Sequence, residues 1–274
     1  MDHPKHILSR YGLDAKRSLG QNFLYDDSIL SAVANAASLQ PQDNVLEIGA
    51  GLGALTFHLA RAAGHVVAVE LDQRLLPILE ENTAGCDNVQ IVHGDILAHE
   101  PQTWFGHEPY KVVANVPYYI TGAILEHILG GEAKPEALVI TVQKEVAERI
   151  TAQPGDMTLL AVSVQIFGEV EIVREISAGS FWPRPDVDSA VLRFTRHAEP
   201  TLTPAEEKAF FRVVRVGFSQ KRKQLQKNLR ALGFERDAIV RLMQQVGIAP
   251  QRRAETLSIK EWLTLYQAIA AGEP

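Results

Sequence analysis

Residues 45–54 read VLEIGAGLGA, and this stretch decides the fold. An apolar run ends in a glycine-rich turn, and a helical pattern follows it. Because glycine has no side chain, its backbone can approach a ligand where other residues would block it. The stretch therefore predicts a strand, a ligand-binding turn and a helix. It also fits the dinucleotide fingerprint, with Gly49, Gly51 and Ala54 at the diagnostic positions, and it fits a merely tight turn. The turn alone leaves the ligand open.

Outward from this turn, short β-branched runs alternate with helical patterns between residues 44 and 195. This alternation is typical of a parallel sheet wound with helices. The last two expected strands follow one another without an obvious helix between them, so we expect them to pair antiparallel at the sheet edge. The fold class is α/β, with a Rossmann-like, seven-stranded, mostly parallel sheet. The expected strands are Asn44–Ile48, Val66–Glu70, Val89–Val92, Lys111–Asn115, Ala137–Val142, Val164–Val173 and Ser189–Thr195.

Different patterns flank the sheet on either side. A helix is expected over residues 27–38, with Asp26 or Asp27 as its N-cap, and an irregular polar leader precedes it. After Pro200 the strand patterns stop, and Thr203 begins a capping pattern followed by three or four amphipathic helices up to Ala271. We therefore expect a leader over 1–25, an α/β domain over 26–199 and a small α-helical C-terminal domain over 200–274.

Charge divides along the chain in the same way. The net charge of −6 over 274 residues, taken alone, argues against a nucleic-acid partner, because cations meeting phosphates supply most of that binding energy. From Leu202 to the end, however, 13 Lys and Arg stand against 7 Asp and Glu. That segment carries +6 and the preceding residues −12, so the C-terminal domain is the basic one.

Several protein classes find no support in the composition. No run of about eighteen apolar residues occurs, and the N-terminus lacks the layout of a secretory signal, so we expect a cytoplasmic protein with no membrane contact. The single cysteine, Cys86, cannot form an internal disulfide, and it falls in an expected loop. Because no Cys or His cluster has ligand spacing, we expect no metal.

Two carboxylates end successive expected strands next to the glycine turn. Glu70 closes the second strand, where a carboxylate can accept hydrogen bonds from both hydroxyls of a ribose. Asp95 closes the third strand, where an acceptor suits the amine of a bound adenine. Either residue alone could be a solvated strand end, and NAD enzymes use the same ribose contact. Together they favour a nucleoside-binding site.

The residues VVANVPYY at 112–119 separate these possibilities. They contain the end of the fourth expected strand, so residues 115–118 are expected at the carboxyl edge of the sheet beside the cofactor crevice. The exocyclic amine of adenine is a poor nucleophile because its lone pair is delocalised into the ring. Two acceptors, the Asn115 side-chain oxygen and the Val116 carbonyl oxygen, would each accept a hydrogen bond from one N–H of this amine. They would thereby turn the lone pair of the nitrogen toward a sulfonium methyl.

The other two residues of this motif have matching uses. Pro117 fixes the backbone so that the carbonyl points inward, and Tyr118 offers a face on which the target base can stack. Positioning supplies most of the rate, and no strong base is needed because the methylated amine loses its proton easily. The alternative is a strand-ending turn with a tyrosine that merely packs. The glycine turn and both carboxylates upstream favour the catalytic interpretation.

With these motifs the chain resembles the ribosomal RNA adenine dimethylase family over nearly its whole length. Residues 16–24, KRSLGQNFL, resemble the family's leader, in which the positions matching Asn22 and Leu24 touch S-adenosylmethionine. Residues 181–191, FWPRPDVDSAV, resemble its proline-spaced entry to the last strand, where Phe181 would sandwich the target adenine against Tyr118. From spacing alone, Phe181 fits a buried core position equally well.

The C-terminal part also carries the resemblance. Residues 218–229 resemble the basic helix that opens the family's C-terminal domain, and residues 211–230 hold seven basic residues and no acidic one. Such a run is usually a solvated helix face, but beside a base-modifying site it suggests a phosphate-contacting surface, supplemented by Arg252 and Arg253. The tail at 253–258 is similar to the small-subunit dimethylases rather than the macrolide-resistance methylases.

Two departures from the family pattern occur. Val116 replaces the usual leucine, which is harmless if only its backbone is used. The loop at 153–160 is shorter than the family's and lacks its Tyr-Gly pair, so substrate handling is where this protein could differ.

The resemblance implies a Rossmann-like methyltransferase that uses S-adenosylmethionine to dimethylate the N6 amines of two adjacent adenines. These adenines lie in the 3′-terminal hairpin loop of small-subunit (16S) rRNA, within a 30S pre-ribosomal particle, and the enzyme is expected to be a monomer. Three alternatives stay open: a large-subunit rRNA methylase, a non-catalytic ribosome-assembly factor and a nicotinamide oxidoreductase.

Overall fold

The computed structural model describes residues 2–272 of the chain. These form two compact units. One, the sheet unit, comprises the residues up to Ala147 together with Glu169–Arg196. The other, the helical unit, comprises Glu148–Gly168 and the residues from His197 onward. Residues 148–168 and 197–199, which were expected in the α/β domain, belong to the helical unit.

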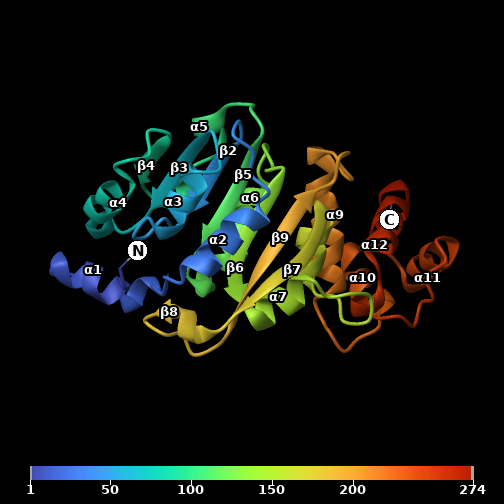
Figure 1. The fold of residues 1–274 in the computed structure, drawn as a ribbon. Helices are drawn as coiled ribbons and strands as arrows, with labels where there is room; N and C mark the ends of the chain where they lie inside the picture. The colour runs from blue at the N-terminus through green and yellow to red at the C-terminus, as the bar shows by residue number, and fades with distance from the viewer. Residues whose placement is uncertain (1, 273–274) are drawn as a thin grey trace. The chain divides into compact units, whose positions relative to one another are not determined.

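The sheet unit is built on a mixed seven-stranded sheet, counted over the described residues, with the order β4-β3-β2-β5-β6-β9-β7 (Figure 1). The first five of these strands pair in parallel, and β9 pairs antiparallel with β6. The expected seven-stranded, mostly parallel sheet is thereby confirmed. The strands are β2 (Asn44–Ile48), β3 (His65–Glu70), β4 (Val89–His93), β5 (Tyr110–Asn115), β6 (Ala137–Gln143), β7 (Gly168–Ile176) and β9 (Ser189–Arg196).

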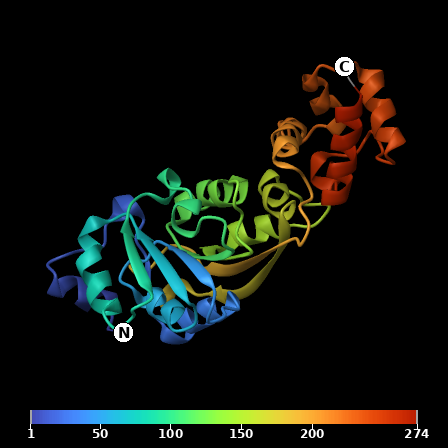
Figure 2. The same ribbon diagram turned by 90° about the horizontal axis from the view of Figure 1, so that it is seen from above.

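Helices cover both faces of this sheet. Figure 2 shows α2 and α3 on one face and α6 on the other. The first face is closed by apolar side chains such as Val33 and Leu59, which pack against strand residues such as Val45 and Val113. Asp26 caps α2 through its side chain, as expected. The helices of this unit after the leader are α2 (Asp27–Ala36), α3 (Ala54–Ala60), α4 (Leu76–Thr83), α5 (Gln102–Phe105) and α6 (Thr121–Gly130). The division between the two units falls within α7 (Lys144–Ile150).

The strand order fixes where a ligand can bind. From β2 the chain winds outward through β3 to β4, whereas β5 returns to the other side of β2 and continues to β6. The register pairs Ile48 with Ala114, so β2 and β5 end side by side. In open α/β sheets the crevice for a ligand lies where the strand order reverses, at the carboxyl ends of the strands. The glycine turn and Asn115 meet at that point.

The prediction for Val164–Val173 was wrong at its start. Residues up to Gln165 belong to helix α8 (Leu159–Gln165), whose N-terminus is capped by the Thr158 side chain. Their apolar side chains, such as Val162, lie in the core of the helical unit, and β7 starts only at Gly168. A short apolar run does not distinguish a buried strand from a buried helix, which explains the error.

The leader is also more ordered than expected. It contains helix α1 (Pro4–Arg10), a 3-10 turn over Arg17–Leu19 and the short strand β1 (Phe23–Leu24). His3 caps α1 through its side chain, and Pro4 occupies the first turn, where proline is tolerated. The expectation of an irregular leader is therefore wrong.

The helical unit has its own core around Phe210 and Trp262. Its first C-terminal helix begins with a capping box between Thr203 and Glu206, as the sequence predicts. In residues 153–158, the Gly155 and Met157 N–H groups donate to the Glu255 carbonyl oxygen, which ties this loop to the tail. The helices after residue 200 are α9 (Pro204–Gly217), α10 (Leu225–Leu229), α11 (Arg236–Gln245) and α12 (Ile259–Ala271).

The basic stretch differs from the expected single helix. Helix α9 ends at Gly217 and α10 begins at Leu225, so residues 218–224 form a loop. The Asn228 amide holds this loop by donating to the carbonyl oxygens of Gly217 and Gln220 at 2.6 and 3.2 Å. Every basic side chain of the stretch is exposed: Arg212, Arg215, Lys221, Arg222, Lys223, Lys227 and Arg230.

Searches of the described residues for two further features found nothing. Over residues 2–272, no helix is both long and apolar enough to cross a membrane. In the same range, no group of three or more His, Cys, Asp or Glu side chains is arranged to hold a metal ion.

Candidate active site

The glycine turn has the conformation that only glycine adopts readily. Gly49, Gly51 and Gly53 have φ values of 78°, 58° and 83°. Space is also limiting, because a Cβ placed on Gly49 would lie 3.2 Å from the Asn115 carbonyl oxygen. The turn therefore brings the end of β2 against the end of β5, with bare backbone on the pocket side.

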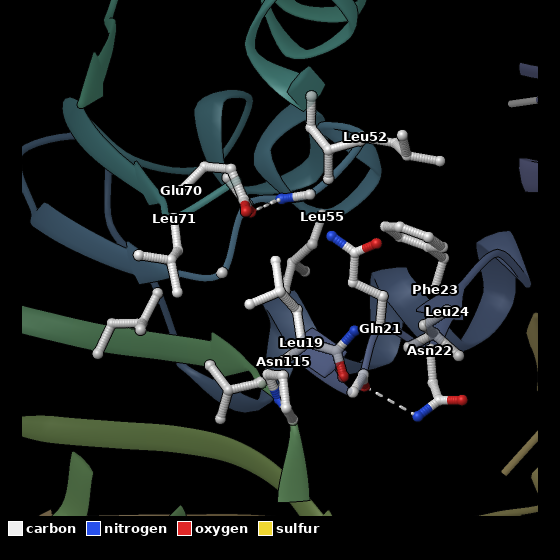
Figure 3. A pocket seen from close by; sticks show the side chains of 18 of the residues that line it. Leu19, Gln21, Asn22, Phe23, Leu24, Leu52, Leu55, Glu70, Leu71 and Asn115 are labelled. Carbon is white, nitrogen blue, oxygen red and sulfur yellow. Dashed lines mark hydrogen bonds between the residues drawn. The ribbon is translucent and has the colours of Figure 1, made fainter. Parts of the chain in front are cut away.

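Glu70 is held by this turn. Its two carboxylate oxygens accept hydrogen bonds from the N–H groups of Gly51 at 2.8 Å and Asp72 at 2.7 Å, as the close view of the pocket illustrates for Gly51 (Figure 3). Only 7% of the residue is exposed, and burial raises the pKa of its carboxyl. Each carboxylate oxygen can accept a second hydrogen bond, so Glu70 keeps acceptor capacity toward the pocket it lines.

Asp95 lies beyond the end of β4 and lines the same pocket. One of its side-chain oxygens accepts a hydrogen bond from the Leu97 N–H at 3.0 Å and so caps the short 3-10 helix Ile96–Ala98. Capping fixes the direction of the exposed carboxylate. Both carboxylates predicted from the strand ends therefore lie at one cavity.

Asn115 and Val116 line the pocket, and each has a polar group without a hydrogen-bond partner among the described residues. Within residues 2–272, the Asn115 side-chain amide makes no hydrogen bond, and no backbone N–H donates to the Val116 carbonyl oxygen. Pro117 follows in an extended conformation, with φ −54° and ψ 136°. All three residues line the pocket. A partly buried polar group without a partner is costly unless a ligand or water engages it, so these acceptors are placed for use.

Two aromatic residues complete the pocket. The Tyr118 hydroxyl shares a 2.6 Å hydrogen bond with the Ser189 hydroxyl at the start of β9, and burial raises the pKa of the tyrosine. Phe181, on the short strand β8 (Phe181–Trp182), is 3% exposed and belongs to the apolar core while it also lines the pocket. Phe181 is therefore a core residue that also contributes to the pocket wall, and its expected contact with a target adenine stays a prediction.

The leader supplies one wall of this pocket. Strand β1 pairs antiparallel with β8, which sets Leu24 opposite Phe181 and Phe23 opposite Trp182. The Phe23 ring also covers the glycine turn, because a Cβ on Gly51 would lie 3.4 Å from it. Asn22 lines the pocket, and its amide donates to the Gly20 carbonyl oxygen at 3.1 Å (Figure 3). The two leader residues expected from the family resemblance are thus at the site.

Sequence reasoning missed several pocket residues in this region. Gln21 donates to an Asp72 carboxylate oxygen at 2.9 Å and accepts from the Lys16 N–H at 2.7 Å, which fixes it in the wall. Pro4, on helix α1, also lines the pocket, and the helical spacing of the apolar residues Ile7, Leu8 and Tyr11 could have predicted that helix. Other unpredicted lining residues are Asp2, Pro4, Leu19, Phe23, Tyr25, Leu30, Leu71, Leu75, Tyr119, Ile120 and Ile124.

The residues present fit a nucleoside. Glycine backbone stands where side chains would fill the crevice, and a carboxylate with spare acceptor capacity lies next to it. Apolar side chains also line the pocket and suit an adenine ring, Leu19 and Leu71 among them (Figure 3). S-adenosylmethionine has these features, and the unused amide of Asn115 lies in the same cavity.

Known proteins have sequences and folds similar to those of this chain. The model of the family described as ribosomal RNA adenine dimethylase matches residues 12–271. Ribosomal RNA small subunit methyltransferase A of Dehalococcoides mccartyi is 43% identical over 267 residues, covering 97% of this chain and 92% of that protein.

Two solved structures extend the comparison. The 23S rRNA methyltransferase ErmE aligns with a TM-score of 0.75 at 32% identity, covering 91% of this chain and 100% of that one. A dimethyladenosine transferase from Plasmodium falciparum aligns with a TM-score of 0.77 at 25% identity, covering 89% and 95%. Since the family model spans almost the entire sequence and a relative exceeds 40% identity, this chain belongs to the ribosomal RNA adenine dimethylase family.

Proposed function

We propose that this protein transfers methyl groups from S-adenosylmethionine to the N6 amines of two adjacent adenines in the 3′-terminal hairpin loop of small-subunit rRNA. The product is N6,N6-dimethyladenosine at both positions. The observation that carries the proposal is the pair of unpartnered acceptors, the Asn115 amide and the Val116 carbonyl, at the end of β5. They lie in one pocket with the glycine turn and Glu70.

The cofactor would lie over the end of β2. Gly49 and Gly51 would offer bare backbone to it, Glu70 would accept from its ribose hydroxyls, and Asp95 would accept from its adenine amine. Asn22 and Leu24 would contact it from the leader side. S-adenosylmethionine supplies an electrophilic methyl group on a sulfonium sulfur. Everything else in the reaction depends on how the chain holds the acceptor nitrogen.

Asn115 and Val116 would hold that nitrogen. Each would accept one N–H bond of the adenine amine, which favours a pyramidal nitrogen with its lone pair directed at the methyl group. Asn115 would therefore contact both the substrate and the methyl donor. Once methylated, the nitrogen is positively charged and releases a proton readily, so the site needs no strong base. Alignment of the reacting atoms supplies most of the acceleration.

Tyr118 and Phe181 would hold the base itself. A target base must leave its stack to reach such a pocket, and aromatic faces compensate for the stacking that it loses. The Ser189 hydrogen bond fixes the Tyr118 ring at its hydroxyl end, which leaves the ring face for the base. The second transfer proceeds with one N–H gone, so only one of the two acceptors is then engaged.

The helical unit would bind the rRNA. Seven basic side chains between residues 211 and 230 are exposed, three of them in the α9–α10 loop, and no acidic residue interrupts them. Arg253 is half exposed, whereas Arg252 is ion-paired with Glu261 and holds the tail of the unit. In this proposal residues 26–199 act as the methyltransferase domain and 200–274 as the RNA-binding domain, in a monomer that acts on pre-30S particles in the cytoplasm.

A methyl-transfer assay on a panel of substrates tests the function. Small-subunit particles lacking the modification should accept four methyl groups in total, two on each adjacent adenine, and large-subunit particles should accept none. Mapping of the methylated bases checks the site. Methylation of large-subunit rRNA instead would identify the methylase class to which ErmE belongs. Binding of NAD but not S-adenosylmethionine would reject the methyltransferase assignment altogether.

A further inference from the structure

Tyr119 is an aromatic side chain that the reaction described above does not use. It is 67% exposed, the largest value among the exposed large hydrophobic residues of the described chain. It lines the same pocket as its neighbour Tyr118, yet its hydroxyl makes no hydrogen bond within residues 2–272. The ring therefore contributes little to the core, and most of its surface faces solvent at the mouth of the pocket.

One edge of the ring nevertheless lies close to the leader at Gly20. A Cβ placed on Gly20 would lie 3.2 Å from Cε1 of Tyr119 and 3.0 Å from Cβ of Pro117. Gly20 has φ 59°, so the leader turns there and lays its backbone against both residues. An aromatic ring positioned in this way offers a large contact area and loses little conformational freedom when a ligand covers it.

The position of Tyr119 matches the neighbour of a flipped base. When one adenine enters the pocket against Tyr118, the next nucleotide stays attached to it by one phosphodiester. That nucleotide would lie outside the pocket, on the side where Tyr119 lines it and is exposed. Bases in single-stranded loops stack on exposed aromatic rings, and such stacking tolerates any base because every base has a π-face.

We propose that Tyr119 is a stacking platform for the nucleotide that adjoins the target adenine. The inference rests on the proposed function, in which that nucleotide is the other adenine of the pair while the first is being methylated. Tyr119 thereby holds the two adenines apart, one in the pocket and one on the rim, and makes the enzyme prefer a target with an adjoining unpaired base.

Steady-state kinetics on unmodified small-subunit particles test this role. Tyr119→Ala should raise the KM for the particles roughly tenfold, because one stacking contact is lost, and leave kcat and the Kd for S-adenosylmethionine unchanged. Tyr119→Phe keeps the ring and should restore the KM. Phe57→Ala is the matched control, since Phe57 is another exposed aromatic residue, 39% exposed, that does not line the pocket.

A binding measurement separates stacking from a structural effect. The adenine analogue 2-aminopurine, placed on either side of the target adenine in two hairpin RNAs, loses fluorescence when it stacks. The wild-type protein should quench one of the two probes, Tyr119→Phe should quench it equally, and Tyr119→Ala should not. Quenching that survives in Tyr119→Ala, or a KM equal to that of the wild-type protein, would overturn the proposal.

These outcomes are distinguishable from failure of the proposed function. If the wild-type protein does not methylate small-subunit particles, the function itself fails. Suppose instead that the wild-type protein methylates these particles, but that both Tyr119→Ala and Tyr119→Phe change the affinity for S-adenosylmethionine or lower the melting temperature. Tyr119 would then act through the leader rather than through RNA, and the stacking role would be rejected.

Discussion

The glycine turn and the leader reach the same pocket by different means. The turn at residues 49–53 is shaped by its own residues, through three positive φ values and close contact with β5. The leader, residues 2–25, is shaped by what it touches: Leu8 is buried among residues of the sheet unit, and β1 exists only as the partner of β8. One part of the site, the glycine turn, is thus formed by its own residues, and another part, the leader, is formed by docking onto the sheet unit. Substitutions in these two parts should therefore affect cofactor binding by different routes.

The largest expected effect comes from undocking the leader. Leu8 is fully buried in a cluster with Leu52, Leu75 and Ile78. Leu8→Ala should cost about 2–5 kcal/mol of leader docking and weaken binding of S-adenosylmethionine severely, because the wall made by residues 19–24 loosens. Isothermal titration measures this. Ser9→Ala, on the exposed side of the same helix, is the control. Equal affinities for the Leu8 and Ser9 variants would show that the leader is dispensable.

A buried acid beneath the turn gives a pH-dependent effect. Glu47 is 1% exposed, and burial raises the pKa of its carboxyl to about 8, against a smaller lowering by the Thr56 side chain. Its ordinary pKa is 4.5, so between these values the folded protein holds a proton that the unfolded chain releases. Stability from this group is therefore fully present below the ordinary pKa and is lost as the pH rises through the raised one.

Glu47→Gln should remove this dependence. Relative to the wild-type protein, the variant should gain stability on the order of a few kcal/mol at about pH 9 and little at about pH 5. Denaturant unfolding at both pH values checks it. A difference between the two proteins that does not change with pH would contradict a neutral, buried Glu47.

The turn itself should respond to a single methyl group. Gly49→Ala forces an alanine into φ 78° and sets its Cβ 3.2 Å from the Asn115 carbonyl oxygen. Strain of about 1–3 kcal/mol should appear as weaker binding of S-adenosylmethionine. Gly85→Ala is the matched control, because its backbone is unstrained and nothing lies within 4 Å of the added atom. If both variants bind alike, the turn does not need glycine.

The smallest expected effect comes from the corresponding glycine substitution in the leader, Gly20→Ala. Gly20→Ala meets a similar obstacle, φ 59° and Pro117 Cβ at 3.0 Å, but the leader can shift as a segment and relieve it. We expect a loss of about 1 kcal/mol in stability and a modest rise in the KM for S-adenosylmethionine. A loss as large as that of Gly49→Ala would mean that the leader is as rigid as the turn.

The same contrast explains what the sequence could predict. Strands, glycine turn, Glu70, Asp95 and residues 115–118 have local signatures, and the structure brings these site residues to one pocket. Gln21 has no local signature, because its place depends on a hydrogen bond to Asp72 across the fold. Asn22, Leu24 and Phe181 were identified only through the family resemblance, since β1 and β8 are too short to be recognised apart from each other.

Two errors have similar causes. The apolar run at residues 159–167 is equally compatible with a strand and a helix, and its burial within the core of the helical unit accompanies the helix that ends at Gln165. The basic stretch keeps a helical pattern through residues 218–224, but the Asn228 amide binds the carbonyl groups of Gly217 and Gln220 and holds a loop there. Long-range contacts decided both cases, and a sequence pattern contains no record of them.

The central claim is that the Asn115 amide and the Val116 carbonyl grip the adenine amine at the end of β5. Methyl transfer to unmodified small-subunit particles by Asn115→Ala tests it most directly, with particle binding measured alongside. The account predicts that methylation is abolished while the particles still bind with an affinity within a few-fold of the wild-type protein, because Asn115 would contribute one contact and the basic side chains of the helical unit most of the others. Substantial methylation by Asn115→Ala, with the same two adenines modified, would contradict it.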